Sequence, residues 1–329
     1  MTAEVLLGLL VGGAFGALAA RGLVCFNAGV RRAAFQRSFG ILRVFAIAVA
    51  VQLLLLPLLV ALDVDPLERA IDAGAPALLP VAQLSGGLVF GIGMALAGGC
   101  ISGILWKSGA GSIATGLAIA GFAVGELVAR GPGDGVLAEL DAAGPQPGES
   151  ALHTVLGLPY WVPALVLGAI GLGLLARRGG LAVGIALGLI AAAAWIAADV
   201  AGYGYGLGFT GTADNVRDSI VAGDFSRLSF EAFLALGVIL GAALAVRGPL
   251  RVPDGARSAR AVLGGLLMGV GANIAHGCNI GHGLTGIALL SLGSLLATAA
   301  MAAGAVVTWR LLLAPSPTVR GVERPEPSW

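Results

Sequence analysis

Three cysteines are the residues of this sequence best suited to chemistry, and two of them lie in the same repeated block. Residues 86–103 (GGLVFGIGMALAGGCISG) align without a gap on residues 264–281 (GGLLMGVGANIAHGCNIG), with 9 identities in 18 positions. Composition alone would give about two identities, so an internal repeat explains the match. A thiol is a soft, weak hydrogen-bonding group. Because Cys100 and Cys278 occupy equivalent places, we expect two backbone-lined elements that meet around a path for a small molecule.

Glycines and amides accompany the three thiols. Cys25 stands in a third glycine-containing segment, which has no cysteine counterpart in the second half. Asn27 and Asn279 could donate hydrogen bonds to the oxygens of an anion, although asparagine also shapes turns. Gly99 and Gly277 directly precede the two repeated cysteines, where exposed backbone N–H groups would give weak, reversible contacts to an anion.

Two histidines flank the third cysteine, in the pattern His276-x-Cys278-x3-His282. This spacing is loose for a metal site, no fourth ligand is evident, and the first copy has Gly98 in place of His276. We therefore expect no metal and no cofactor, and we interpret both histidines as polar groups that line or stabilise the turn.

Composition defines the elements that must position these residues. Of 329 residues, 57% are hydrophobic and 11% charged, with 54 glycines and a mean hydropathy of +0.94, which indicates an all-α polytopic protein embedded in a lipid bilayer. The sequence has no nucleotide-binding motif of the G-x-x-x-x-G-K-[ST] type, which argues against nucleotide hydrolysis. We also expect no nucleic-acid partner. Nine apolar stretches are candidate transmembrane helices, some joined by short helices or loops that dip into the membrane: 5–20, 44–62, 77–97, 109–129, 160–176, 181–200, 230–246, 261–275 and 287–313.

The distribution of charge predicts the topology. Arginines concentrate in 21–43 and 247–260, whereas 63–72 is acidic, which places the amino terminus outside and the carboxyl terminus in the cytoplasm. With nine crossings, corresponding helices of the two copies start on opposite sides of the membrane, so we expect inverted repeats at about 1–130 and 181–313 with a linking helix at about 157–176. These form one transport domain (1–329). We expect a disordered cytoplasmic tail at 314–329.

The segments RGLVCFN (21–27), GGC (98–100) and HGCNIGHG (276–283) resemble the three cysteine motifs of the YeeE/YedE family of bacterial sulfur transporters. The resemblance implies a bundle of two inverted halves in the bacterial inner membrane, which takes up thiosulfate and is not an enzyme. It also implies that Cys25, Cys100 and Cys278 pass the anion along a narrow path by hydrogen bonds. A cytoplasmic acceptor would be a separate sulfur-carrier protein.

Thiosulfate has one soft terminal sulfur and three hard oxygens, which fits a site of thiols, amides and backbone N–H groups. A passive channel or transporter for another small solute, such as a selenium compound, remains an alternative. A membrane thiol-redox protein is a weaker alternative, because the sequence has no C-x-x-C pair. Glu126, near the outer end of the fourth stretch, is either a functional group at membrane depth or a side chain that extends to the interface.

Overall fold

Helices form the regular structure of the computed structural model, which describes residues 2–73, 77–145 and 150–313. Within these ranges there is no strand, and two isolated bridges join Ser112 to Arg251 and Ala151 to Ser291. The expected all-α class is therefore confirmed. The expected carboxyl-terminal tail at 314–329 lies outside the described residues.

Each of the nine apolar stretches coincides with a helix. These long helices are α1 (Thr2–Arg21), α3 (Gly40–Val60), α5 (Pro80–Ala97), α7 (Ile113–Arg130), α10 (Trp161–Leu175), α11 (Leu181–Val200), α13 (Phe230–Ala245), α14 (Gly255–Ile274) and α15 (Leu292–Leu311). Six helical stretches among the described residues are long and apolar enough to cross a membrane: Ala3–Gln36, Gly40–Val60, Pro80–Gly109, Ile113–Arg130, Leu181–Val200 and Leu292–Leu311. The protein is thus a multi-pass membrane protein.

The two largest differences from the expected helix boundaries are at helix starts that polar side chains cap. Helix α14 begins six residues before the expected start at residue 261, since the Asp254 carboxylate accepts a 2.7 Å hydrogen bond from the Arg257 backbone N–H. Helix α15 begins after the expected start at residue 287, since Ser291 Oγ accepts a 3.1 Å bond from the Ser294 backbone N–H. Hydropathy alone does not detect such caps.

Short helices follow the three cysteines directly. Cys25 precedes α2 (Phe26–Gln36), Cys100 precedes α6 (Ile101–Gly109), and Cys278 precedes a helical segment that contains the π-helix η3 (Gly281–Gly286). A fourth short helix, α12 (Thr212–Ala222), follows Gly211. The remaining short elements are α4 (Asp65–Asp72), α8 (Asp134–Ala142), α9 (Leu152–Val155), η1 (Ala176–Arg178) and η2 (Phe225–Arg227).

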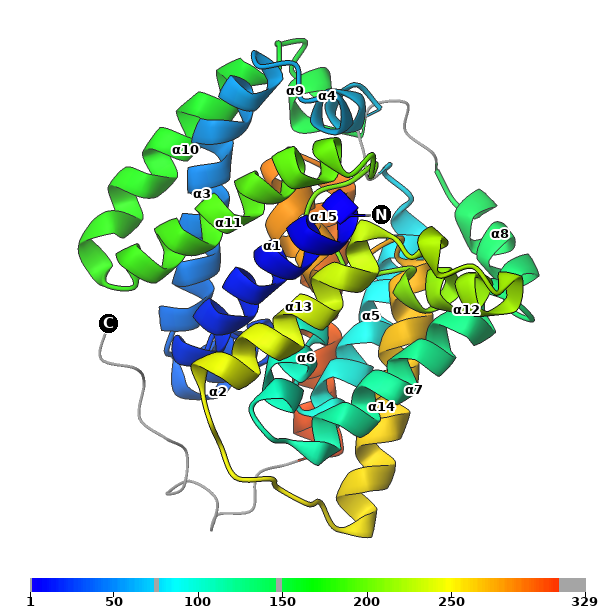
Figure 1. Ribbon diagram of the computed structural model, residues 1–329. Helices are drawn as coiled ribbons and strands as arrows, with labels where there is room; N and C mark the ends of the chain where they lie inside the picture. The colour runs from blue at the N-terminus through cyan, green and yellow to red at the C-terminus, as the bar shows by residue number, and fades with distance from the viewer. Residues whose placement is uncertain (1, 74–76, 146–149, 314–329) are drawn as a thin grey trace.

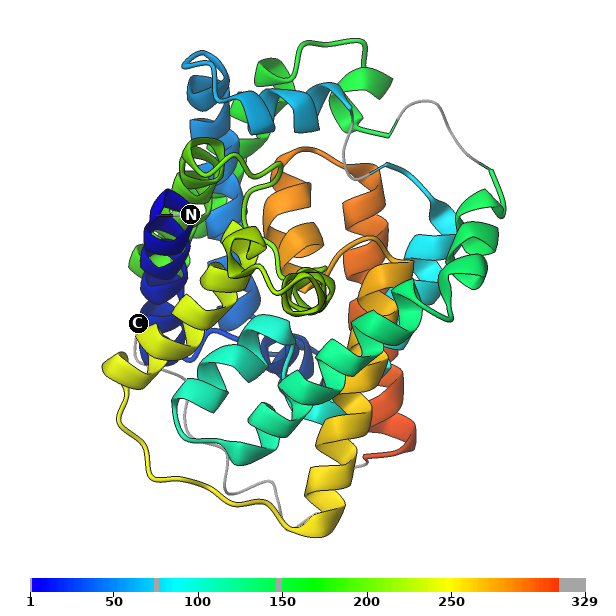
Figure 2. The same cartoon turned by 45° about the vertical axis from the view of Figure 1, so that its right-hand side comes forward.

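Glycines let the long helices approach one another closely. Helix α1 packs along α13, and α7 packs along α14 (Figure 1). At the second crossing, a Cβ atom on Gly121, Gly125, Gly265 or Gly269 would fall on a backbone atom of the neighbouring helix. Small residues at such crossings are typical of membrane helices, because packing rather than the hydrophobic effect drives their association. Figure 2 shows α1 (dark blue) with α13 (yellow) on one side, α7 (green) crossing α14 (yellow to orange) on the other, and short helices between them.

Candidate functional site

The Cys25 and Cys100 thiols meet in the interior of the protein. Their Sγ atoms are 3.8 Å apart, and the two residues are 1% and 0% exposed. Each residue is the N-cap of its short helix, so the positive ends of α2 and α6 converge on this thiol pair. Two soft sulfur atoms beside two helix N-termini form a site suited to an anion that carries a soft atom.

The contacts around the thiol pair fix its geometry. Trp106 Nε1, on α6, donates a 3.0 Å hydrogen bond to the Val24 carbonyl, which ties α6 to the chain just before α2. Gly103 lies against both sulfurs, and a Cβ at this position would be 2.6 Å from the Cys25 Sγ. The thiols can therefore occupy this arrangement only because α6 has no side chain at residue 103.

Cys278 belongs to a second group of contacts, at the start of η3. Its Sγ accepts a 3.5 Å hydrogen bond from the Gly281 backbone N–H. Thr285 Oγ1 donates to the Leu207 carbonyl at 2.6 Å, and Tyr205 donates to the Gly281 carbonyl at 3.0 Å, so this turn is attached to the segment before α12. Among the contacts of the described residues, Cys278 is not paired with either of the other thiols.

Asn27 and Asn279 are buried beside the cysteines with unused hydrogen-bonding atoms. Asn27 is 5% exposed and its Oδ1 has no partner among the described residues. Asn279 is 0% exposed, and neither its Oδ1 nor its Nδ2 has a partner there. Buried amides are almost always hydrogen-bonded, so these unpaired amide atoms beside the thiols are candidates for contact with a bound molecule. The Asn279 Nδ2 and its hydrogens are available to an oxyanion.

The two histidines of the loose metal pattern lie in different environments. His282 is fully buried, with Nε2 2.8 Å from the Ala275 carbonyl and Nδ1 3.0 Å from Ser294 Oγ. Because a carbonyl oxygen only accepts, Nε2 carries the proton of a neutral ring and Nδ1 accepts from Ser294. His276 instead faces outward, where its Nε2 is 2.7 Å from the Asp141 carboxylate on α8. The structure does not bring the two rings together around Cys278.

The glycines before the repeated cysteines have different surroundings. A Cβ on Gly277 would lie 2.8 Å from His282 Nε2, so the absence of a side chain at this position lets the buried ring pack against the turn. A Cβ on Gly99 would lie 3.1 Å from Ile104 Cγ2 and 3.3 Å from the Gly103 carbonyl carbon, which is tight but less close than the contact at Gly277. Gly277 is therefore the more constrained of the two.

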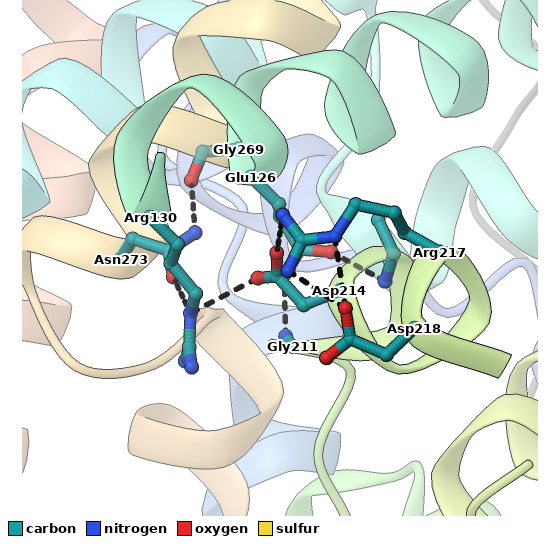
Figure 3. A network of polar contacts seen from close by, with 9 residues as sticks. Glu126, Arg130, Gly211, Asp214, Arg217, Asp218, Gly269 and Asn273 are labelled. Atoms are coloured by element: carbon teal, nitrogen blue, oxygen red, sulfur yellow. Dashed lines mark hydrogen bonds and ion pairs between the residues drawn. The ribbon is translucent and has the colours of Figure 1, made fainter. Parts of the chain in front are cut away.

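Glu126 holds the N-terminus of α12 (Figure 3). Its carboxylate accepts hydrogen bonds from the Gly211 backbone N–H at 2.5 Å and the Ala213 backbone N–H at 3.1 Å, and the side chain is 0% exposed. The side chain thus points into the protein, toward the start of α12, rather than outward. Arg130 adds a 3.2 Å ion pair to Asp214 on α12. A carboxylate at a helix N-terminus is a favourable pairing, and here it joins α7 to α12.

Lys107 is a neighbour of the site that the sequence analysis missed. Its Nζ lies 4.0 Å from the Cys25 Sγ and donates a 2.7 Å hydrogen bond to the Gly98 carbonyl. The available signal was composition, because Lys107 is the only lysine in the sequence and lies seven positions after Cys100.

Comparisons with known proteins identify the family of this chain. A family model described as Sulphur transport matches twice, at residues 21–182 and 177–307. A relative named thiosulfate transporter TsuA, from Spirochaeta thermophila, is 33% identical over 317 residues, which cover 88% of this chain and 94% of the relative. A relative of the same name from Escherichia coli K12 is 29% identical over 327 residues, covering 88% of this chain and 90% of the relative. The proteins of this group are transporters rather than enzymes, and the chain belongs to their family, the sulphur transport or YeeE/YedE family.

Proposed function

We propose that this protein carries thiosulfate across the bacterial inner membrane along a path that contains Cys25, Cys100 and Cys278. The observation that carries the proposal is the buried thiol pair, with Sγ atoms 3.8 Å apart at two converging helix N-termini. The names of the relatives supply the substrate, since both are thiosulfate transporters. The amides of Asn27 and Asn279 and the backbone N–H groups at the helix starts would contact the three oxygens.

The thiols bind the soft sulfur of the anion in succession. A thiol donates a weak hydrogen bond, so each contact with thiosulfate is easily broken and the anion moves to the next one. A chain of strong cationic sites would instead retain a dianion. Two adjacent thiols allow a handover in which the terminal sulfur of thiosulfate contacts both Cys25 and Cys100 before it leaves either. Cys278, at the start of the segment that contains η3, supplies the third contact.

Two inverted halves with nine crossings are the topology that we infer. The helix contacts support it: α1 packs on α13 while α11 packs on α3, and α7 packs on α14 while α15 packs on α5. These pairs exchange when the first half is superimposed on the second, and α5 packs on its own counterpart α14. A pseudo-two-fold axis produces this exchange, with α10 as the unpaired linking helix.

The amino terminus lies outside and the carboxyl terminus in the cytoplasm in this proposal. The support is the concentration of arginine in 21–43 and 247–260, opposite to the acidic segment 63–72. With this orientation α1 ends just before Cys25 on the cytoplasmic side, and α14 ends just before Cys278 on the outer side. Thiosulfate would therefore meet Cys278 first and leave past Cys25. A separate cytoplasmic sulfur-carrier protein is the acceptor that we expect.

Uptake in cells that lack other sulfur importers tests the substrate. Labelled thiosulfate is offered alone and with unlabelled sulfate, sulfite, sulfide or selenite. Sulfate is the informative competitor, because it has the charge and shape of thiosulfate but a hard oxygen in place of the soft sulfur. We expect uptake that sulfate does not inhibit. Inhibition by sulfate as strong as by unlabelled thiosulfate would contradict a thiol-based path, and absence of uptake would contradict the function.

A further inference from the structure

A basic pocket lies next to the thiol pair. Its volume is about 500 Å³, within the range of about 300–1,000 Å³ that is typical of small-molecule sites. It is formed by the end of α5, the end of α6, the start of α7 and the segment 246–261. Gly98, Trp106 and Lys107 form part of its wall. Lys107 contacts the Cys25 thiol, and Trp106 bonds the Val24 carbonyl next to Cys25.

The charge of the pocket is of one sign. Lys107, Arg251, Arg257 and Arg260 line it, and none of the other described lining residues is acidic. The nearby Asp254 caps α14 through the Arg257 backbone N–H and is not part of the lining. Among the described residues, none of these four cations is in an ion pair with a carboxylate. Four cations without paired anions create a field that concentrates anions.

Lys107 connects the pocket to the path. Its Nζ is 4.0 Å from the Cys25 Sγ, and the side chain is half-buried, while the three arginines are exposed. The corresponding stretch of the second repeat, between Gly281 and Gly293, contains neither lysine nor arginine. The lysine is therefore specific to the first copy of this duplicated segment, as expected of an exit that differs from the entrance.

We propose that this basic pocket is a second anion site, which receives a small divalent oxyanion from Cys25 and releases it into the cytoplasm, with Lys107 as the positioning cation. The inference rests on the proposed function and adds the place where the anion leaves the thiols. An ammonium is a compact point charge that attracts an oxyanion without bidentate geometry. Because the three arginines are exposed, salt screens them, and the anion dissociates from the pocket into solution.

The test uses Cys25 as a reporter that does not depend on transport. In purified protein with Cys100→Ala and Cys278→Ala, the rate of Cys25 modification is measured with a negatively and a positively charged methanethiosulfonate reagent of similar size. The ratio of the two rates reports the local charge and cancels changes in access. Lys107→Met should lower the ratio of anionic to cationic rates by about tenfold, and Lys107→Arg should restore it. Arg177→Gln, an exposed cation outside the pocket, should leave it unchanged.

Occupancy is tested in the same assay. Thiosulfate or sulfate should slow modification by the anionic reagent in detergent without added lipid, and Lys107→Met should abolish this protection. Protection by anionic phospholipid alone would mean that a lipid headgroup fills the pocket and would overturn the proposal, as would a rate ratio that Lys107→Met does not change. Failure of wild-type cells to take up thiosulfate would instead overturn the proposed function, while the modification ratio would still report the pocket.

Discussion

Replacement of Gly103 by alanine tests the geometry of the thiol pair. The added methyl group would lie 2.6 Å from the Cys25 Sγ and 3.3 Å from the Cys100 Sγ. Carbon and sulfur atoms in ordinary contact are on the order of 3.5–4.0 Å apart, so the Cys25 sulfur must move by about 1 Å. Overpacking of this kind costs about 1–3 kcal/mol. If the cost falls on the transporting arrangement, uptake falls by about 5- to 150-fold.

Gly281→Ala is the matched control. Gly281 occupies the equivalent position in the second repeat, three residues after Cys278, and a Cβ there would lie 4.0 Å from the Cys278 Sγ, an ordinary contact. Both substitutions add the same methyl group to a short helical segment, so their effects on helix propensity cancel in the comparison. We expect uptake by Gly281→Ala to stay within about threefold of wild type.

Initial rates of labelled thiosulfate uptake are measured for both variants at equal amounts of folded protein, as determined by size-exclusion chromatography in detergent. The expected result is a folded Gly103→Ala protein with slow uptake and a Gly281→Ala protein with near-normal uptake. Equal uptake by the two variants would refute the inference that transport requires the Cys25 and Cys100 sulfurs in contact.

Three further predictions concern other parts of the site. Glu126→Gln should lower the melting temperature in detergent, because hydrogen bonds to charged groups contribute about 1.5–3 kcal/mol and the amide has one oxygen in place of the two that accept from the Gly211 and Ala213 N–H groups. An unchanged melting temperature would contradict this role. Mild oxidation should join Cys25 to Cys100 and inhibit uptake reversibly, since the sulfurs need to approach from 3.8 Å to about 2.05 Å; inhibited protein in which mass spectrometry finds no Cys25–Cys100 disulfide would exclude this disulfide as the cause. Asn279→Ala should raise the KM for thiosulfate without lowering the melting temperature, because its amide has no partner among the described residues; a lower melting temperature with an unchanged KM would assign it a structural role.

The long helices and the sites of the breaks were predictable because they depend on local sequence. Apolar length marks each long helix, and the repeated glycine block locates the breaks before Cys100 and Cys278. The helix starts were predicted less accurately where a capping residue sets them, as at Asp254 and Ser291. A cap is a single polar side chain, and a hydropathy average over many residues does not detect it.

The contacts within the site were not predictable, because they join positions far apart in the sequence. Nothing in the order of residues pairs Cys25 with Cys100, which are 75 positions apart. Glu126 illustrates the same limit: its place near a helix end allowed either of two orientations, and the N-terminus of α12 determined which one formed. His276 and His282 are close in sequence, but His276 itself occupies the turn, with φ +60°, and the two side chains contact different elements.

Uptake by purified protein in liposomes tests most directly whether thiosulfate crosses the membrane through contact with the thiol pair. Initial rates for labelled thiosulfate and labelled sulfate are compared between wild type and Cys100→Ala, which removes one of two sulfurs 3.8 Å apart and adds no atoms. We expect wild type to transport thiosulfate and exclude sulfate, and Cys100→Ala to lose thiosulfate transport while remaining folded. Transport of thiosulfate by Cys100→Ala at the wild-type rate would contradict the proposed path.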